Sequence, residues 1–431
     1  MKVAADQSAR KDFEGSDLIV AEEQTVSYGN PTLRFTHRTA RVTVVLTDYT
    51  EERMFVRLTG LSTENGNPAQ ITPYNKGGDT YTALVAPQSV ATGTAFITCK
   101  FTNGKVFVYK MKNDTDWQAG KEYTYTVSLA AAKDPGYTVS EDGKTYTVTS
   151  ADGLLAWNEA VQKDMTLNCT LADNIDLTGK DWTPIGTSFG NSYTGTFDGN
   201  GKTITGLTVT GSDRYTGLFG FIKGTVKNVV LTEINITSGT FVGGVAGWSF
   251  GGNIENCSVS GSVSGSDVGG VVGYQQGGSI TGCSSSATVK GTQRAGGVAG
   301  TTNSGATLTA CYATGDVTVE NDGTSNAWAG GVVGSNAYST VIACYAAGNV
   351  SGTGSGTIHV GGVTGENFDG TLTACYWSGL PDNDNGGATK VDGTTVTWQT
   401  AVAAMNAALS GKGWQYELKD GNSLPTLKKE Q

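Results

Sequence analysis

The sequence predicts an all-β protein, in which an N-terminal antiparallel β-sandwich is followed by a parallel β-helix with short capping helices. Three observations lead to this prediction. Glycine provides 62 of the 431 residues, about twice the ~7% of average proteins. Short runs that alternate apolar and polar residues fill the first third of the chain, and a glycine phrase recurs six times between residues 215 and 377. Alternation with a period of two puts one set of side chains inside a sheet and the other in water.

The recurring phrase reads Gly-Gly-Val, any residue, Gly. Complete copies begin at Gly243, Gly269, Gly296, Gly330 and Gly361, so successive copies are 26, 27, 34 and 31 residues apart. A looser first copy occupies residues 217–220. Repetition at a period of about 20–50 residues indicates stacked repeats. We therefore expect each copy to form one coil, with the paired glycines at corners where the backbone needs positive φ or where adjacent coils approach closely.

Two inward columns of side chains are expected to run along the coils. The valine of each phrase forms the first. The second holds Val229 in the first coil, and in the others it holds Cys257, Cys283, Cys311, Cys344 and Cys375. Because valine fills the same slot, we interpret the thiols as buried core groups in a ladder of free cysteines. Stacked coils hold Cβ vectors parallel, which gives poor disulfide geometry. No histidine accompanies the ladder to complete a metal site.

Composition and charge exclude several classes of partner. The net charge is −10, and Lys and Arg form no basic run, which argues against nucleic acid and anionic membrane surfaces. No apolar run approaches the ~18 residues of a membrane span. Residues 1–6 lack the apolar segment of a signal peptide. We expect an exported protein of the cell surface, associated with the outer membrane, whose export signal is not present in this chain.

Residues 33–129 are expected to form the β-sandwich. The predicted strands are 41–46, 55–58, 81–85, 94–101, 106–111 and 123–129. Short alternating strands separated by turn residues are typical of such a fold, and Asn103-Gly104 is a strong signal for a tight hairpin. Cys99 alternates in phase with Ile97 and Phe101, so it is predicted to be a core residue.

Several stretches of this region resemble the second domain of fimbrillin-like surface proteins of Bacteroides-type bacteria. They are Asp17–Ala21, Leu33–Val42, Tyr81–Gln88 with its terminal Pro-Gln, and Gly120–Tyr125. The resemblance covers about 115 residues. It implies a β-sandwich that assembles with other fimbrial subunits at the cell surface.

A hinge is expected at Ala132–Gly136, where charged residues are followed by Pro-Gly. It divides the chain into a fimbrillin-like domain at residues 1–132 and a β-helix domain at residues 133–431. The open end of a solenoid exposes unpaired strand edges, so each end needs a cap.

The two caps are expected at residues 137–165 and 390–431. The first contains a hairpin followed by a short helix, with Asp152 as its N-cap. The second contains an alanine-rich helix from Trp398 to Leu409 and a closing strand pair at residues 414–427.

The repeat region resembles the GLUG-motif repeat domain. The resemblance rests on Phe-Asp-Gly-Asn-Gly at residues 197–201, followed by Gly-Leu-Phe-Gly at residues 217–220 and by the glycine and cysteine repeats. It covers about residues 150–378. The resemblance implies a β-helical surface module, which also occurs in some secreted immunoglobulin A proteases, and it does not imply a reaction.

We expect no catalytic site, cofactor or metal. Enzymes that cleave glycans need converging carboxylates, but no two acidic residues of the coils occupy equivalent slots in adjacent coils. These residues are Glu255, Asp267, Asp316, Glu320, Asp322, Glu366 and Asp369. The two histidines, His37 and His359, lie far apart in the sequence and are expected to be structural. The His-Glu-x-x-His motif of metalloproteases does not occur.

Aromatic residues near the glycine phrases are the candidate ligand contacts. They are Trp248, Phe250, Tyr274, Tyr338 and Phe368, together with Trp328 at the end of the inserted loop 320–328. Exposed in a row, such side chains would suit sugar rings or a protein partner. The alternative is that they pack between coils at the corners. The inserted loop and the acidic loop at residues 381–385 are further candidates, because loops on rigid scaffolds often carry binding residues.

These features together predict a non-enzymatic cell-surface adhesin, a fimbrial tip or accessory subunit that binds a host or microbial glycan or protein. The tip position is what the fimbrillin resemblance implies. Stalk subunits of that family offer a C-terminal strand to a neighbour, whereas this C-terminus carries a large folded module. Two alternatives stay open: a glycan-binding or glycan-degrading β-helix of a polysaccharide-use system, and a structural spacer.

Overall fold

A computed structural model describes the chain except for residues 1–2, 25–28, 30–31, 49–52, 102–105, 130–135, 212, 238, 324, 421–422 and 431. The chain divides into two compact units, Met1–Thr138 and Val139–Gln431. Both units are built mainly from strands, which confirms the predicted fold class. Most of the predicted hinge and the predicted Asn103-Gly104 turn lie outside the described residues.

The N-terminal unit contains two main sheets. The first has the order β11 (Glu122–Ser128), β3 (Ala40–Thr47), β6 (Thr80–Val85), β5 (Tyr74–Gly77), and the second has the order β4 (Arg53–Leu58), β8 (Ala95–Phe101), β9 (Val106–Lys110). Short pairs join β1 (Ile19–Val20) to β2 (Thr36–His37) and β7 (Gln88–Val90) to β10 (Thr115–Trp117). The unit also holds α1 (Arg10–Gly15) and the 3-10 helix η1 (Thr63–Asn65).

The core of this unit lies between the two sheets. Val42 and Val44 of β3 belong to the same buried cluster as Phe96 and Cys99 of β8, so Cys99 is the core residue that the alternation predicts. The strands pair antiparallel in both sheets, except that β11 runs parallel to β3.

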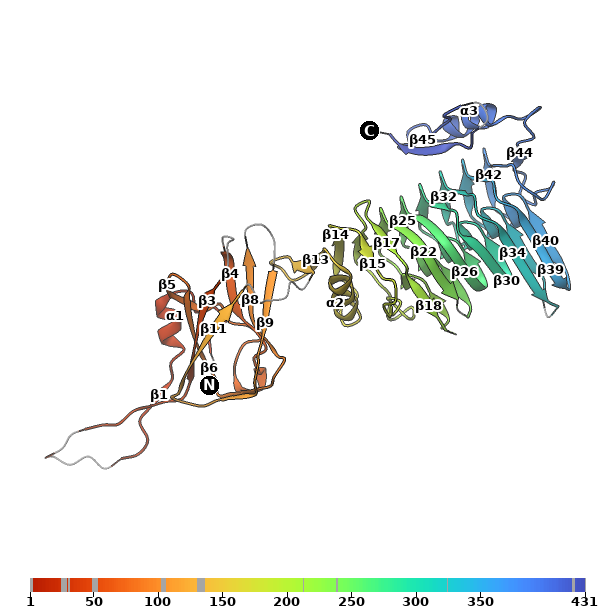
Figure 1. Cartoon of the computed structure of the whole chain (residues 1–431). Helices are drawn as coiled ribbons and strands as arrows, with labels where there is room; N and C mark the ends of the chain where they lie inside the picture. The colour runs from red at the N-terminus through yellow and green to blue at the C-terminus, as the bar shows by residue number, and fades with distance from the viewer. Residues whose placement is uncertain are drawn as a thin grey trace. The chain divides into compact units, whose positions relative to one another are not determined.

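The second unit is a parallel β-solenoid of three sheets, whose stacked coils run from yellow-green to blue in Figure 1. Sheet I contains β13 (Thr145–Val148), β14 (Asn168–Leu171), β16 (Thr196–Asp198), β21 (Thr225–Lys227), β25 (Asn253–Glu255), β28 (Ser279–Thr281), β32 (Thr307–Thr309), β37 (Thr340–Ile342) and β42 (Thr371–Thr373). The strand β12 (Tyr137–Val139) spans the boundary between the units.

Sheets II and III complete each coil. Sheet II contains β20 (Phe219–Ile222), β24 (Ala246–Phe250), β27 (Val272–Gln276), β31 (Ala299–Asn303), β36 (Val333–Ala337) and β41 (Thr364–Phe368). Sheet III contains β15 (Ile175–Asp176), β17 (Thr203–Thr205), β18 (Thr208–Thr210), β19 (Tyr215–Thr216), β22 (Val230–Thr237), β23 (Phe241–Gly243), β26 (Ser258–Gly269), β29 (Ser284–Ser285), β30 (Thr288–Gly296), β33 (Tyr312–Ala313), β34 (Val317–Asp322), β35 (Ala327–Gly330), β38 (Tyr345–Ala346), β39 (Val350–Ser355), β40 (Ile358–Gly361), β43 (Tyr376–Trp377) and β44 (Thr389–Lys390).

Successive coils approach very closely at the glycine phrase, which forms the corner between sheets III and II. None of the glycines in the five complete phrases has positive φ, so close approach is the reason for glycine there. A Cβ atom on Gly297 would collide with the carbonyl oxygen of Gly331 and with the side chain of Ala313. The backbone continues the stack, since Val298 N–H donates to the Val332 carbonyl of the next coil at 2.9 Å.

Both predicted inward columns are present. The valine column consists of Val245, Val271, Val298, Val332 and Val363, which are all fully buried. The cysteine column is buried as well, and all seven cysteines are free thiols. In place of disulfides, the thiols donate to backbone carbonyls, as Cys283 Sγ does to the Ile254 carbonyl at 3.5 Å.

A helix covers the first end of the solenoid. The helix α2 (Ala151–Val161) buries Trp157, whose ring lies 5.2 Å from the ring of Phe197 between centroids. The N-cap is Ser150, whose side chain accepts a hydrogen bond from Gly153 N–H. The prediction of Asp152 as the N-cap is therefore wrong, because Ser150 is the last residue with extended backbone and Asp152 already lies in the first turn.

The acidic loop closes the other end. Asp384 accepts hydrogen bonds from the N–H groups of Val363 and Thr364 at 2.8 and 2.7 Å. In the preceding coil the equivalent N–H groups of Val332 and Val333 donate to the carbonyl of Val363. The Asp384 carboxylate thus takes the place of a further coil. Sequence reasoning proposed residues 381–385 as a ligand-binding loop, and the structure gives them this capping contact.

The C-terminal segment packs along the side of the coils, whereas the sequence led us to expect residues 390–431 at the end of the solenoid. It consists of α3 (Trp398–Ala408), β45 (Trp414–Glu417) and β46 (Thr426–Lys429) and lies beside the coils in Figure 1. Tyr345 donates to the Pro425 carbonyl at 2.6 Å, and Tyr416 donates to the Ala343 carbonyl at 2.9 Å.

One outward column of sheet III changes from serine to tyrosine along the coils, and this change explains where the C-terminal segment packs. The column reads Ser258, Ser284, Tyr312, Tyr345 and Tyr376 in register. Its tyrosine half forms an aromatic strip, and the rings of Tyr312 and Tyr345 stack at 4.9 Å. Covering this strip removes apolar surface from water, which stabilises the segment along the side of the coils.

Substitution of Gly297 by alanine tests the corner. Gly297→Ala is expected to lower the free energy of unfolding of the solenoid by about 3 kcal/mol, because the added methyl group has no space. Urea unfolding of the full chain measures the effect. Gly190→Ala is the matched control, because a Cβ atom there meets nothing within 4 Å. Equal stabilities of the two variants would contradict close approach at the corner.

Substitution of Asp384 tests the cap. Asp384→Ala is expected to cost about 2 kcal/mol, because it leaves backbone N–H groups of the last coil without acceptors. Hydrogen exchange of the Val363 and Thr364 amides should become faster. Asp382→Ala is the control, since Asp382 is almost fully exposed and its ion pair with Lys390 is of the weak surface kind. Unchanged exchange in Asp384→Ala would show that the loop does not cap the coil.

The buried thiol of Cys375 predicts that the stability of the solenoid depends on pH. Burial raises the pKa of the Cys375 thiol to about 12, above the ordinary value of about 8.5. The buried thiol stays neutral at pH values where the thiol of the unfolded chain ionises. Its contribution to stability is therefore full below about pH 8.5 and is lost as the pH rises toward about 12.

At pH 8 a thiol reagent should label no cysteine of the native chain and all seven after denaturation. Rapid native labelling would contradict a buried ladder.

Candidate functional site

Two columns of outward side chains flank the glycine corner, and we call them together the corner strip. The column on sheet III consists of Tyr215, Phe241, Asp267, Arg294, Trp328 and His359. The column on sheet II consists of Phe221, Trp248, Tyr274, Thr301, Ser335 and Glu366. Because the corner is tight, members of the two columns face each other, as Phe241 and Trp248 do at 4.8 Å between ring centroids.

The first half of the corner strip is an aromatic cluster. Trp248 and Tyr274 lie 4.4 Å apart, and Trp248 also stacks on Phe221 at 5.7 Å. Phe221 and Phe241 are buried, and both Trp248 and Tyr274 are half-buried. Rings at these distances stabilise one another beyond the burial of their surface. Two of the sequence candidates therefore pack between coils, which is the alternative that sequence reasoning left open.

The second half of the corner strip is polar and charged. Arg294 Nη1 lies 3.2 Å from each carboxylate oxygen of Asp267, and the guanidinium lies 5.1 Å from the ring centroid of Trp328. Burial raises the pKa of the Asp267 carboxyl, and the Arg294 guanidinium opposes that rise. Each group thus has a partner within the protein.

Trp328 and Glu366 extend this half of the strip. The Trp328 ring stacks on the imidazole of His359 at 6.0 Å and 11°. Glu366 accepts a hydrogen bond from Ser335 Oγ at 2.6 Å. Half-buried Trp328 and His359 thus lie beside a charged pair.

The remaining aromatic candidates lie elsewhere on the coils. Tyr338 and Phe368 form a T-shaped pair at 5.2 Å, and each is 53% exposed. Phe250 packs on exposed Phe189 at 5.1 Å. The six candidates consequently occupy the corner strip, the Tyr338–Phe368 pair and the Phe250–Phe189 contact, and they do not form one row.

Sequence reasoning missed Arg294 and Phe189, and it treated His359 as a structural residue. A signal for the column on sheet III was available, because Phe241, Asp267, Arg294, Trp328 and His359 each precede a Gly-Gly pair by two residues. The position of Phe189 had no such signal, because that residue lies before the first glycine phrase.

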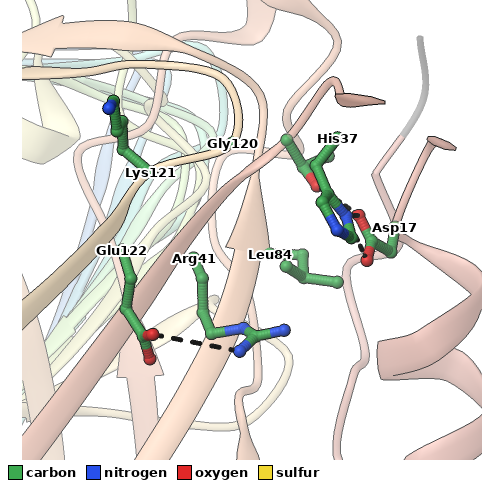
Figure 2. Close-up of a pocket in the computed structure, with 8 residues that line it drawn as sticks. Asp17, His37, Arg41, Leu84, Gly120, Lys121 and Glu122 are labelled. Carbon is green, nitrogen blue, oxygen red and sulfur yellow. Dashed lines mark hydrogen bonds and ion pairs between the residues drawn. The ribbon is translucent and has the colours of Figure 1, made fainter. Parts of the chain in front are cut away.

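The N-terminal unit has a separate polar pocket of about 140 Å³. Figure 2 shows His37 Nδ1 directed at the Asp17 carboxylate, 2.9 Å away, and Arg41 directed at Glu122, 4.0 Å away. Thr39 Oγ1 also donates to Asp17 at 3.0 Å. His37 is thus hydrogen-bonded to Asp17 within the unit, which fits the structural role expected from the sequence.

Among the described residues, no group of three or more His, Cys, Asp and Glu side chains could hold a metal ion. No helix in the described part of the chain has the length and apolar character to cross a membrane.

Two family models match the chain. The model described as fimbrillin-like matches residues 1–152, and the model described as the GLUG motif matches residues 238–264 and 264–290. Halomucin of Haloquadratum walsbyi is 36% identical over 108 residues, which are 22% of this chain and 1% of halomucin. The match to this relative is thus confined to about 1% of its length.

One solved structure shares the fold over much of this chain. A protein of Bacteroides ovatus, provisionally named an immunoglobulin A1 protease, is 20% identical with a TM-score of 0.53, over 67% of this chain and 93% of that protein. A structure named IgA1 protease is 17% identical with a TM-score of 0.43, over 80% of this chain and 28% of that one, and this TM-score is too low to carry an argument. Residues 1–152 thus match the fimbrillin-like model, and residues 238–290 of the solenoid match GLUG motifs.

Proposed function

We propose that this protein is a non-enzymatic cell-surface adhesin, a tip or accessory subunit of a fimbria. The fimbrillin-like match at residues 1–152 supports association with other fimbrial subunits and a place on the cell surface. In this proposal the solenoid is the part that presents the ligand-binding surface, and its ligand is a host or microbial glycan or protein.

The observation that carries the proposal is the exposed pair Tyr338 and Phe368. Single exposed apolar residues are normal on protein surfaces, but these two rings lie in contact and each is 53% exposed. Rings that lie half in water add little to folding, and aromatic residues are enriched where proteins bind partners. A flat, rigid pair of rings suits a sugar face or an apolar side chain of a partner.

The charges of the corner strip favour binding over catalysis. Asp267 is paired with Arg294, and Glu366 accepts from Ser335. The two carboxylates lie three coils apart, which is about 14 Å at the spacing of β-strands. Glycosidases place their two carboxyl groups about 5–10 Å apart. One solved structure of similar fold is named as a protease, but it is only 20% identical to this chain. Its name therefore does not indicate that this chain is a protease.

A binding assay tests the adhesin proposal. The purified chain is applied to arrays of host and microbial glycans and of host surface proteins, and both retention and cleavage of the immobilised molecules are measured. Retention without cleavage is expected. The double variant Tyr338→Ser with Phe368→Ser should bind at least about tenfold more weakly, because it removes both rings from the contact.

Phe189→Ser is the matched control, because Phe189 is also an exposed ring, at 58%, and lies outside the pair. The control should bind like the unaltered chain. Cleavage of any immobilised molecule, or equal binding by the double variant, would contradict the proposal.

A further inference from the structure

A second pocket lies where the C-terminal segment meets coils in the middle of the solenoid, and we call it the junction pocket. It has a volume of about 310 Å³ and is lined by Lys227, Asn228, Glu255, Asn256, Thr281, Trp414 and Lys429. Its floor is formed by the ends of β21, β25 and β28, which belong to consecutive coils. Trp414 of β45 and Lys429 of β46 form the opposite wall. The volume is within the range of about 300–1,000 Å³ of small-molecule sites.

A ladder of amide side chains ends in this pocket. Asn256 Nδ2 donates to Asn228 Oδ1 at 2.8 Å, and Asn228 Nδ2 donates to Asp198 Oδ1 at 2.9 Å. Both asparagines have positive φ, a backbone conformation that asparagine tolerates better than most residues. The Oδ1 atom of exposed Asn256 accepts no hydrogen bond from the described residues, so the ladder offers an acceptor to the pocket.

The amide ladder stops at the next coil, where glycine takes the place of asparagine. Gly282 has positive φ like Asn228 and Asn256, and Ala310 and Ala343 have positive φ at the same position of the following coils. A Cβ atom on Gly282 would collide with the indole of Trp414, so glycine allows the C-terminal segment to lie directly on the coil. The pocket is therefore the place where uncovered amides meet the edge of the covering segment.

The polar groups of the junction pocket favour a neutral ligand. Lys227 is paired with Asp198 at 3.3 Å, which leaves the Lys429 ammonium and the Glu255 carboxylate as opposite charges. Asn228, Asn256 and Thr281 add neutral donors and acceptors. Adjacent hydroxyl groups of a sugar need both a donor and an acceptor close together, and this lining provides them.

The Trp414 indole adds an apolar wall. Trp414 is 7% exposed and lines the pocket, and Lys429 Nζ lies 5.8 Å from its ring centroid. An aromatic surface beside amides and a carboxylate suits the mixed apolar and polar faces of a pyranose ring. We propose that the junction pocket binds a neutral pyranose unit of a saccharide. This site shares no residue with the Tyr338–Phe368 pair, so the two proposals can fail separately.

Titration calorimetry tests the site on the full chain. The probes are methyl α-glucopyranoside, methyl β-galactopyranoside and N-acetylglucosamine, with glucuronate and inorganic phosphate as anionic comparisons. At least one neutral sugar is expected to bind with a Kd of about 1 mM or tighter. Glu255→Gln and Asn256→Ala should each weaken this binding at least about tenfold, because each removes an acceptor from the ligand.

Asn200→Ala is the matched control. Asn200 is another asparagine with positive φ, and it does not line the pocket, so its loss should leave sugar binding unchanged. Thermal unfolding shows that each variant is folded. The proposal is overturned if no neutral sugar binds at about 10 mM, if the anions bind in preference, or if Glu255→Gln and Asn256→Ala bind like the unaltered chain. The proposal is also overturned if sugar binding is lost in the double variant Tyr338→Ser, Phe368→Ser but is retained in Glu255→Gln and Asn256→Ala.

Discussion

The close contact of successive coils at the glycine corner is the constraint on which the rest of the solenoid depends. A side chain on Gly297 or Gly331 would meet the backbone of the next coil. With glycine there, backbone N–H groups of each coil donate to carbonyl groups of the next coil. The valine and cysteine side chains of successive coils then stack in two buried columns. The same tight corner brings the two columns of the corner strip face to face, so the geometry of the surface follows from the packing inside.

A stack of coils leaves two open ends, and this chain closes them by different means. At the first end α2 covers the core with Trp157. At the other end Asp384 accepts the backbone hydrogen bonds that a further coil would accept. Unpaired strand edges favour association with other chains, and both devices reduce the exposed edges of the solenoid. The C-terminal segment is then free to cover the tyrosine column and to wall the junction pocket.

Much of this fold could be predicted from the sequence, because repetition reports on backbone geometry. The spacing of the glycine phrases predicted the coils, and a slot that accepts both Val229 and Cys257 predicted a buried thiol ladder. The helix that begins near Asp152 was expected, but its N-cap was not, since Ser150 and Asp152 are both good capping residues. The sequence shows that α3 has an apolar face without showing which surface that face covers, so its place beside the tyrosine column was not foreseen. For the same reason, the sequence named the aromatic candidates but did not show which of them pack against neighbouring rings. Trp248 packs against buried Phe241, whereas Tyr338 and Phe368 form an exposed pair.

The most direct measurement of the stacked coils is a set of distances between spin labels on one outward column. Thr210, Thr237, Ser264, Lys290, Thr318 and Ser351 follow one another in register. Labels at Thr210 and Ser351 are five coils apart and should be separated by about 24 Å, and each shorter pair should lose about 4.8 Å per coil. The native cysteines are buried, so introduced cysteines can be labelled selectively. Distances that do not increase in equal steps along this column would contradict a parallel solenoid, and with it the surfaces proposed to bind ligands.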